Sequence, residues 1–287
     1  MDQQLTARLT TVLGTSLERL TAISSSWGLV IYKAETVDGK SFAVKAGRSH
    51  LEGHLETEAM MLGALGRDST LPVPQVIHGA ADLLVMNWIE NDGGPVTAAH
   101  QRHAGELVAA LHMTPRARFG YDRPTVIGGL AQPNEPCASW IEFFRDRRLL
   151  PFARHAHDRA RMPAALLHRL ETLGGHLDEY LSEPDHPALL HGDMWSGNVL
   201  VRGEAVAAFI DPAVCCGHPE IELAFTTLFS TFGNTFFDAY RPHAPLASDF
   251  FDLRRDLYNI YPNLVHAILF GPSYFAPIDQ VLKRLGI

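Results

Sequence analysis

Residues 191–198 bring several side chains that could do chemistry into one short loop. The segment reads HGDMWSGN and lies between two apolar runs. After His191, Gly192 and Asp193 come four residues and then Asn198. A catalytic loop for phosphoryl transfer, H-R-D-x-x-x-x-N, has this spacing: its Asp accepts a hydroxyl proton and its Asn binds Mg²⁺. The segment therefore predicts Asp193 as a catalytic base and Asn198 as a metal ligand.

A second carboxylate follows in the sequence FIDPA, after another apolar run. Its Asp211 stands where such a phosphotransferase carries a further metal-binding Asp. Phosphoryl transfer needs one carboxylate to orient the nucleophile. It also needs a carboxylate and an amide oxygen to hold the cation that bridges the phosphates. We predict that Asp211 and Asn198 hold Mg²⁺. Turn chemistry would explain single Asp and Asn residues, but not their joint spacing with His191.

The segment SFAVKAG places Lys45 at the end of a β run, where a lysine can contact nucleotide phosphates. An exposed lysine at a strand end is the alternative. The helix that follows offers Glu52, Glu56 and Glu58 as ion-pair partners. Glu58 lies within an apolar stripe, where an unpaired carboxylate would be costly to bury. We therefore predict an ion pair between Lys45 and Glu58.

The loop over the phosphates and the site for the adenine are less distinct. In ISSSWGLVIY, Gly28 stands alone where a phosphate loop usually carries several glycines. Ser25 and Ser26 are predicted to offer hydroxyl and backbone N–H groups to phosphate, with an ordinary loop as the equal alternative. Adenine is expected against the backbone of the segment LLVMNWIE, at the four residues Met86, Asn87, Trp88 and Ile89.

Other catalytic motifs are absent from the sequence. There is no G-x-x-x-x-G-K-[ST] phosphate loop, no G-x-S-x-G nucleophile elbow and no H-E-x-x-H zinc motif. A metallohydrolase that used the same acidic residues would lack a set of histidine and carboxylate ligands. His155 and His157 are expected to be solvated.

These residues need elements that hold them together. In the first third, WGLVIYKAETVDGKSFAVKAG predicts two strands around a turn at Asp38–Gly39. The segment HLETEAMMLGALGR has helical spacing and predicts a helix that ends near Gly66. Two more strands follow in VPQVIHGAADLLVMNWIE, with a turn near Gly79–Asp82. The segment NDGGP, Asn91–Pro95, is the best candidate for a linker.

Beyond this linker the sequence is mainly helical. A helix is predicted over TAAHQRHAGELVAALHMT with Thr97 as its N-cap, and helices follow around 138–156 and 163–181. Short β runs ALL, VLV and VAAFI flank the HGD loop, and helices resume from about Pro219. We predict an α+β, bilobal fold. A small β-rich nucleotide-binding lobe would comprise residues 1–90, and a larger, mainly helical catalytic and substrate lobe residues 91–287.

The composition is that of an ordinary soluble globular protein, with 46% hydrophobic and 20% charged residues in a chain of 287. A formal net charge of −8 argues against a nucleic-acid-binding protein. Three cysteines, two of them adjacent, give no disulfide framework and no Cys-x-x-Cys metal pair. The sequence shows no signal peptide and no membrane-spanning run, so we expect a cytoplasmic protein that binds no membrane.

Several features together resemble the fructosamine kinase (ketosamine-3-kinase) family: Lys45 and the segments HGDMWSGN, IDPA, GHPEIELAF and YNIYPNLVHAILFGPSY. That family lies within the aminoglycoside phosphotransferase- and choline-kinase-like enzymes, which have a protein-kinase-like fold. The H-G-D-x-x-x-x-N and I-D patterns are common to the wider group. The Trp195–Gly197 and Gly217–Glu220 stretches point to the fructosamine kinase branch. The resemblance covers nearly the whole chain.

The resemblance implies an ATP- and Mg²⁺-dependent kinase of ketoamines. Such an enzyme phosphorylates a sugar hydroxyl of a fructosamine or ribulosamine, as a small molecule or bound to protein, and so takes part in protein deglycation. It implies Asp193 as the base, Asn198 and Asp211 as Mg²⁺ ligands, and Lys45 at the α- and β-phosphates.

The resemblance also implies a substrate site. Trp195 would line the sugar–amine pocket, because an indole can cover sugar C–H faces and attract an ammonium; packing of the loop is the alternative. His218 and Glu220 would belong to the same site. The chain departs from the family at Cys215–Cys216, where aromatic residues are common. It also departs at Glu222, where Asp is common and where a carboxylate is expected to brace the catalytic loop.

Two other functions remain open from the sequence. The same chemistry could act on another amino alcohol, such as an aminoglycoside or choline. A non-catalytic nucleotide-binding protein could also use this fold, although it would have no physical reason to keep Lys45, Asp193, Asn198 and Asp211 together. A monomer is the default expectation.

Overall fold

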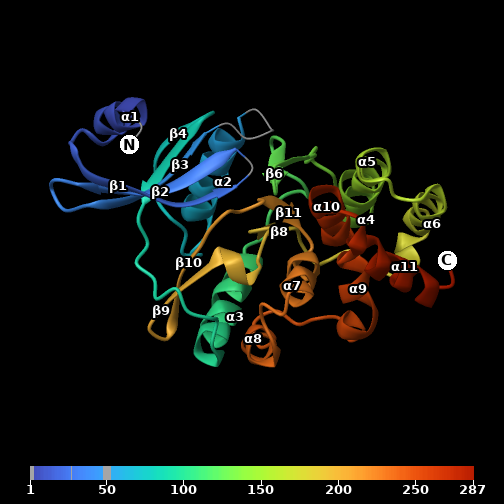
Figure 1. Ribbon diagram of the computed structural model, residues 1–287. Coiled ribbons are helices and arrows are strands. Elements are labelled where there is room, and N and C mark those ends of the chain that lie inside the picture. The colour runs from blue at the N-terminus through green and yellow to red at the C-terminus, as the bar shows by residue number, and fades with distance from the viewer. Residues whose placement is uncertain (1–2, 27, 48–52) are drawn as a thin grey trace.

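The computed structural model describes residues 3–26, 28–47 and 53–287, with a large sheet at one end of the molecule and helices at the other (Figure 1). The sheet is antiparallel, with five strands in the order β1-β2-β3-β5-β4. These strands are β1 (Leu17–Ser26), β2 (Leu29–Thr36), β3 (Ser41–Gly47), β4 (Val76–Ala80) and β5 (Leu83–Asn87). The predicted hairpin is confirmed: β2 pairs with β3 around a turn in which Gly39 has a φ of 81°.

Two helices cover this sheet, α1 (Gln3–Leu13) on one face and α2 (His54–Asp68) on the other. The apolar cluster on the α1 side consists of Leu5, Leu9, Ala34, Val44, Leu83 and Val85. The cluster on the α2 side consists of Leu55, Leu62, Leu84 and Met86. Side chains alternate between the two faces of a strand. Because Val44 faces α1, its neighbour Lys45 faces α2.

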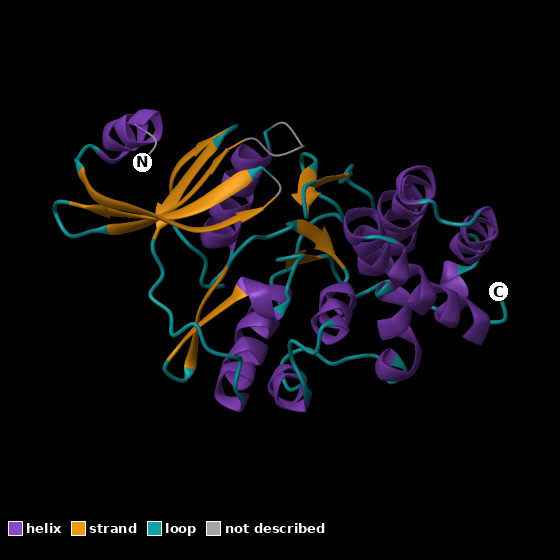
Figure 2. Ribbon diagram, viewed as in Figure 1, coloured by secondary structure: helices purple, strands orange, loops and turns teal. Residues whose placement is uncertain are grey.

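The remainder of the chain is mostly helical, with short paired strands at its centre (Figure 2). Its first elements are α3 (Ala98–His112), β6 (Thr125–Ile127), β7 (Leu130–Gln132), α4 (Trp140–Phe143), α5 (Leu150–Ala160) and α6 (Ala164–Gly174). The later ones are β8 (Ala188–Leu190), β9 (Val199–Arg202), β10 (Ala205–Phe209), β11 (Cys215–Gly217), α7 (Pro219–Leu228), α8 (Asn234–Tyr240), α9 (Arg255–Tyr258), α10 (Ile260–Phe270) and α11 (Phe275–Arg284). The pairs β6–β7, β8–β11 and β9–β10 are antiparallel. The expected strands on either side of the HGD loop, β8, β9 and β10, are confirmed.

A π-helical segment, Phe144–Leu149, joins α4 to α5, so the helix predicted over 138–156 is continuous but locally underwound. Proline has no N–H to donate to the carbonyl four residues earlier. For Pro151 that carbonyl belongs to Arg147, and it accepts instead from the Arg148 guanidinium at 3.0 Å. The Arg148 side chain is buried, and its guanidinium also donates to Oδ1 of Asn134 at 2.6 Å.

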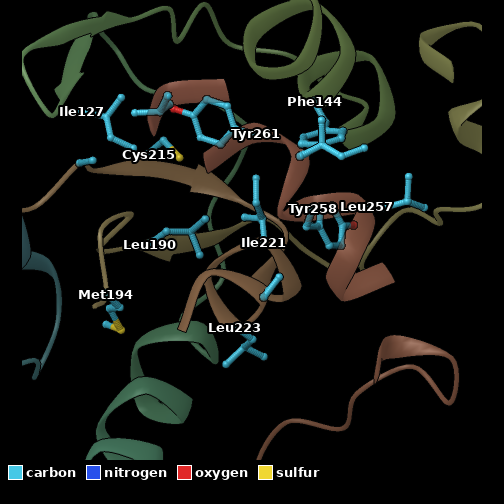
Figure 3. Close-up of a cluster of buried hydrophobic side chains, with 14 of the residues drawn as sticks. Ile127, Phe144, Leu190, Met194, Cys215, Ile221, Leu223, Leu257, Tyr258 and Tyr261 are labelled. Atoms are coloured by element: carbon cyan, nitrogen blue, oxygen red, sulfur yellow. The ribbon is translucent and has the colours of Figure 1, made fainter. Parts of the chain in front are cut away.

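One large apolar cluster joins the central strands to the surrounding helices (Figure 3). Trp140 lies at its centre, stacked on Phe143 and Phe144, and its indole N–H donates to the hydroxyl of Tyr258 at 3.0 Å. Figure 3 shows side chains of β8, β11, α7 and α10 meeting in this cluster. The core thus holds β8, which leads into the HGD loop, and β11, which follows the segment that carries Asp211.

Residues 88–97 run between β5 and α3 without helix or strand. The backbone N–H of Asp92 donates to Val201 at 2.8 Å, and its carboxylate accepts from the N–H of Gly203 at 2.7 Å. The two-part α+β architecture expected from the sequence is confirmed, and we propose the boundary between the parts at residues 90 and 91. Among the described helices, none has the length and apolar character needed to cross a membrane.

Candidate active site

The HGD loop starts directly after β8 and ends in a 3₁₀ turn, Ser196–Asn198, that leads into β9. The Nδ2 atom of Asn198 donates to the backbone carbonyl of Asp193 at 2.9 Å and to its Oδ2 atom at 3.0 Å. The amide nitrogen is therefore directed at Asp193, so Oδ1 of Asn198 is the atom that would face a cation. Four residues separate Asp193 from Asn198 in the chain, and the 3₁₀ turn brings the Asn198 side chain back to Asp193.

His191 ties this loop to the segment that carries Asp211. Its ring is buried, and Nδ1 accepts a hydrogen bond of 3.3 Å from the N–H of Asp193. Burial lowers the pKa of His191, so the ring stays neutral and can accept this bond. The carbonyl of His191 accepts from the N–H of Ala213 at 2.7 Å. The two loops that carry Asp193 and Asp211 are thus held to each other.

Gly192 replaces the arginine of the H-R-D pattern for a steric reason. It has a φ of 87°, and a Cβ atom here would lie 2.1 Å from the carbonyl oxygen of Ala213. Glycine alone tolerates both the left-handed backbone and the close approach. The N–H of Gly192 donates to Oε1 of Glu222 at 2.5 Å.

A buried chain of polar groups continues from Glu222. Its Oε2 atom lies 2.8 Å from Nε2 of His112, whose Nδ1 lies 2.9 Å from the hydroxyl of Tyr240. The side chains of Glu222 and His112 are fully buried. Glu222 therefore holds the catalytic loop in the way expected of a carboxylate at this position. The contributions of His112 and Tyr240 could not be read from any local pattern.

Lys45 bridges two carboxylates that come from different parts of the chain. Its Nζ lies 2.6 Å from Oε1 of Glu58 and 2.6 Å from Oδ1 of Asp211. Burial alone would lower the pKa of Lys45, but the charges of Asp211 and Glu58 outweigh it and raise this pKa. Lys45 is therefore a fixed cation. Glu58 makes the predicted ion pair, Glu56 is exposed, and Glu52 lies outside the described residues.

Asp193 lies in a setting that suits a general base. Burial raises the pKa of Asp193 to about 7, the charge of Asp211 adds to this, and the hydrogen bond from Asn198 opposes it. General bases work best with a pKa near the operating pH. A carboxyl group with this pKa can accept a hydroxyl proton and release it again near neutrality.

The donors at Asn198 and Asp211 fit a magnesium ion that is shared with phosphate oxygens. Mg²⁺ is usually bound by one or two protein carboxylates, with phosphates and waters as its other ligands. Within 3–26, 28–47 and 53–287, no group of three or more His, Cys, Asp or Glu side chains could hold a metal by itself. This donor set suits a nucleotide-bound cation, not the resident metal of a hydrolase.

A cavity of about 420 Å³ lies beside the candidate catalytic side chains. Lys45, Asp193 and Asp211 line one part of it, and Ser26 lines it from the end of β1. The volume is in the range of small-molecule sites. Ser25 is exposed and is not part of the lining, and both serines end a strand: Ser26 pairs with Leu29 across the β1–β2 turn.

The residues predicted to hold adenine, Met86–Ile89, already use part of their backbone hydrogen bonding. The N–H of Asn87 donates to Gln75 and that of Trp88 to Ser41, at 3.0 and 3.1 Å. The carbonyl of Ile89 accepts from Asn91 Nδ2 at 3.0 Å. Met86 is buried against α2. Adenine recognition by the N–H groups of Asn87 and Trp88 would require these bonds to open.

Trp195 lies outside the cavity lining, on the exposed side of the HGD loop. Its side chain is 40% exposed and makes an edge contact with Phe229, with ring centres 6.3 Å apart. A Cβ atom on Gly197 would lie 2.3 Å from the indole, so glycine lets the ring fold over its own loop. The placement is compatible with packing of the loop and with a wall for a ligand at its rim.

His218 and Glu220 do not join the other site residues. His218 caps α7 by accepting from the N–H of Glu220 at 3.1 Å, and its ring lies 6.0 Å from that of Trp140. Glu220 accepts from the N–H of Ala247 at 3.0 Å. Both are buried, and neither lines the cavity. Their placement therefore does not support a direct contact with substrate; these residues hold α7 and the segment before it.

The far wall of the cavity was not anticipated. It consists of the β6–β7 hairpin, the end of α10 and two residues of α5, His155 and Arg159. The expectation that His155 is solvated was wrong, because its side chain is half-buried in this wall. The sequence signals the hairpin only through Gly128–Gly129, both with positive φ. Its position near Asp193 depends on tertiary packing.

Comparison with known proteins identifies the family of this chain. Residues 1–286 match the family described as fructosamine kinase. A probable ketoamine kinase of Synechocystis sp. is 34% identical over 259 residues, 86% of this chain and 84% of the relative. The chloroplastic protein-ribulosamine 3-kinase of Arabidopsis thaliana is 30% identical over 284 residues, 93% of this chain and 84% of the relative. The crystal structure of a candidate fructosamine-3-kinase from Thermobifida fusca has a TM-score of 0.89 at 33% identity, covering 97% of both chains. The chain belongs to the fructosamine kinase family.

Proposed function

We propose that this protein transfers the γ-phosphoryl group of ATP, with Mg²⁺, to a sugar hydroxyl of a ketoamine. The observation that carries the proposal is the meeting of Lys45, Asp193 and Asp211 at one cavity, although Lys45 and Asp211 are 166 residues apart in the chain. Asn198 joins them through its 3.0 Å hydrogen bond to Asp193. A fixed cation, an amide, a metal-binding carboxylate and a base are the parts that phosphoryl transfer requires. The names of the relatives supply the ketoamine as the acceptor class.

The residues divide the reaction between them. Asp193 accepts the proton of the acceptor hydroxyl as its oxygen forms a bond to the γ-phosphorus. The bond from that phosphorus to the β–γ bridging oxygen breaks, and ADP leaves with the electron pair. Lys45 offsets negative charge on the phosphates, and Asn198 and Asp211 would hold the Mg²⁺, which neutralises charge that develops on the phosphoryl oxygens. Asn198 also keeps the Asp193 carboxylate oriented through its 3.0 Å bond.

An aromatic cluster at the rim of the HGD loop suits a ketoamine acceptor. Trp195 contacts Phe229, whose ring centre lies 4.9 Å from that of His266, which in turn lies 5.2 Å from Tyr274. Aromatic faces bind sugar C–H groups and attract an ammonium. A ketoamine presents both groups next to the hydroxyls. This cluster supports the assignment of Trp195 to the acceptor site.

The test is ADP release from Mg²⁺-ATP with a panel of ribulosamines, fructosamines, aminoglycosides and choline. Release that depends on a ketoamine and on Mg²⁺ is the expected result. Release with choline or an aminoglycoside alone would assign another acceptor class. ATP binding with no release on any member of the panel would favour a nucleotide-binding protein without catalysis.

We also propose that the enzyme is cytoplasmic and monomeric, and that it acts on small or protein-bound ketoamines in deglycation. The three cysteines are free thiols, and Cys215 and Cys216 are buried in β11. Unpaired thiols are typical of proteins in a reducing compartment.

A further inference from the structure

The far wall of the cavity carries two basic side chains on one helix. His155 and Arg159 are four residues apart on α5, so they share a face, and both line the cavity that also contains Asp193 and Asp211. Helix α5 packs on α10, and β6 packs on α2 (Figure 1). Residues of all four elements line the cavity. The nucleotide phosphates are expected near Lys45. The wall at α5 is then left for the acceptor.

Arg159 differs from three nearby arginines, each of which is paired with a carboxylate. Arg145 pairs with Asp146 at 2.7 Å, Arg147 with Glu135 at 2.8 Å, and Arg154 with Glu171 at 3.4 Å. Arg159 has no ion pair or hydrogen bond with any residue of the described ranges. A guanidinium that faces a cavity without a carboxylate partner keeps its five N–H donors available for a ligand.

His155 complements this charge with a neutral donor. Burial lowers the pKa of His155, the charge of Arg159 lowers it further, and Asp158 opposes the shift. The imidazole is therefore neutral at pH 7 and can donate one N–H to an anion beside the guanidinium. Arg159 supplies the charge and the forked geometry that carboxylates and phosphates match in pairs of hydrogen bonds.

We propose that Arg159, assisted by His155, binds an oxyanion on the acceptor, so that the enzyme prefers low-molecular-mass ketoamines that carry a carboxylate or a phosphate. This inference rests on the proposed function. A glycated free amino acid has its carboxylate close to the glycated nitrogen, whereas a glycated lysine side chain within a protein does not. A ketoamine derived from a sugar phosphate offers the same chemistry from the other end of the molecule. The shared feature is an oxyanion held while a hydroxyl of the same molecule lies at Asp193.

The experiment uses three acceptors that differ in the oxyanion they carry: ribulosyl-glycine has a carboxylate, ribulosyl-glycinamide has none, and the 5-phosphate of ribulosyl-glycinamide has a phosphate. The kcat/KM of each is measured for the wild type, Arg159→Gln and Arg159→Lys at saturating Mg²⁺-ATP. Arg154→Gln is the matched control, because Arg154 lies on the same helix, is exposed and pairs with Glu171. For each protein, the kcat/KM of an anionic acceptor is divided by the kcat/KM of ribulosyl-glycinamide. Comparing this ratio between the wild type and a variant isolates the contact with the anion.

We expect one anionic acceptor to be favoured over ribulosyl-glycinamide by about 10- to 100-fold, which is the range for a hydrogen bond to a charged group. Arg159→Gln removes that preference, and Arg159→Lys retains part of it. Any change in the use of the neutral acceptor divides out of the acceptor ratio. A preference for the glycine adduct identifies the carboxylate as the source of the oxyanion, and a preference for the 5-phosphate identifies the phosphate.

Three results would overturn the inference. The wild type could use all three acceptors equally, Arg159→Gln could keep the preference, or Arg159→Gln could raise the KM for ATP instead, which would assign Arg159 to the nucleotide. These outcomes leave the proposed function intact. Absence of turnover with every ketoamine, with ATP still bound, would instead refute the proposed function, and this inference with it.

Discussion

Oε1 of Glu222 accepts a hydrogen bond of 2.5 Å from the backbone N–H of Gly192, directly before the candidate base Asp193. The same carboxylate contacts His112 at 2.8 Å and is fully buried. A buried carboxylate thus fixes the backbone from which Asp193 projects. Position, in addition to residue type, determines whether a base can reach the acceptor hydroxyl.

Glu222→Met, which keeps the length of the side chain but removes the acceptor, should therefore reduce turnover more than nucleotide binding. We expect kcat to fall by about 10- to 100-fold, because small misplacements of a catalytic group have effects of this size. The KM for ATP should change little, and stability should fall by about 1–3 kcal/mol because the buried N–H of Gly192 loses its acceptor. Steady-state kinetics and urea unfolding provide these values, with exposed Glu56→Met as the control. Unchanged kcat in Glu222→Met would show that this hydrogen bond does not position Asp193.

Gly192→Ala tests the close approach of the two catalytic segments. The added Cβ would lie 2.1 Å from the carbonyl of Ala213, at a φ of 87°. Gly203→Ala is a matched control, because Gly203 also has a positive φ, 60°, and nothing lies within 4 Å of its Cβ position. Backbone strain alone is expected to cost about 1–2 kcal/mol. We expect Gly192→Ala to be more destabilised than Gly203→Ala in urea unfolding, and to lose activity that Gly203→Ala keeps. Equal behaviour of the two variants would rule out the steric explanation.

Lys45 is predicted to have separable structural and nucleotide-binding roles. Lys45→Met leaves Glu58 buried without its partner at 2.6 Å, and breaking such a pair costs about 3–5 kcal/mol. Adding Glu58→Gln removes the unpaired charge, so the double variant should regain part of the lost stability. Affinity for Mg²⁺-ATP, measured by calorimetry, should stay weak in both variants. If the double variant bound Mg²⁺-ATP with wild-type affinity, Lys45 would not belong to the nucleotide site.

His218 should make stability depend on pH in mildly acidic solution. Burial in the packing of α7 lowers the pKa of His218 from 6.5 to about 3, with smaller effects of Arg254 and His112 in the same direction. Below pH 6.5 the unfolded chain binds a proton at this site that the folded protein does not bind. Stability therefore falls as the pH falls from 6.5 towards 3, with a slope from this site of about 1.4 kcal/mol per pH unit.

His218→Asn keeps a side chain that can cap α7 and removes the titrating group. The free energy of unfolding, measured in urea between pH 4.5 and pH 7, should fall less steeply for this variant than for the wild type. Parallel curves for the two proteins would show that His218 does not contribute to the acid sensitivity.

The parts of the site that follow from short patterns could be predicted. Asp193 and Asn198 depend on a loop of fixed length between two strands. The orientation of Lys45 depends on alternation along β3, and Glu58 stood out because it interrupts an apolar stripe. Each of these signals involves residues close in sequence, so the physical constraint is local.

The remaining parts depend on contacts between distant segments. The side chains of His112, Tyr240 and Glu222 come from three helices, and 128 residues separate His112 from Tyr240. Nothing near His112 or Tyr240 in the sequence reveals the contact. His155 was expected to be solvated because α10, which packs on its helix, is remote in the chain. His218 and Glu220 were assigned to the substrate by resemblance alone, and their burial in the packing of α7 could be seen only in three dimensions.

The most direct test of the central claim is transfer of the γ-phosphoryl group from labelled ATP to ribulosyl-glycine, followed by mass spectrometry of the acceptor. The wild type should yield a singly phosphorylated ketoamine and an equal amount of ADP. Asp193→Asn should bind Mg²⁺-ATP with nearly wild-type affinity and form this product at least about a hundredfold more slowly, the loss typical of a missing general base. Product formation at the wild-type rate in Asp193→Asn would contradict the assignment of Asp193 as the base.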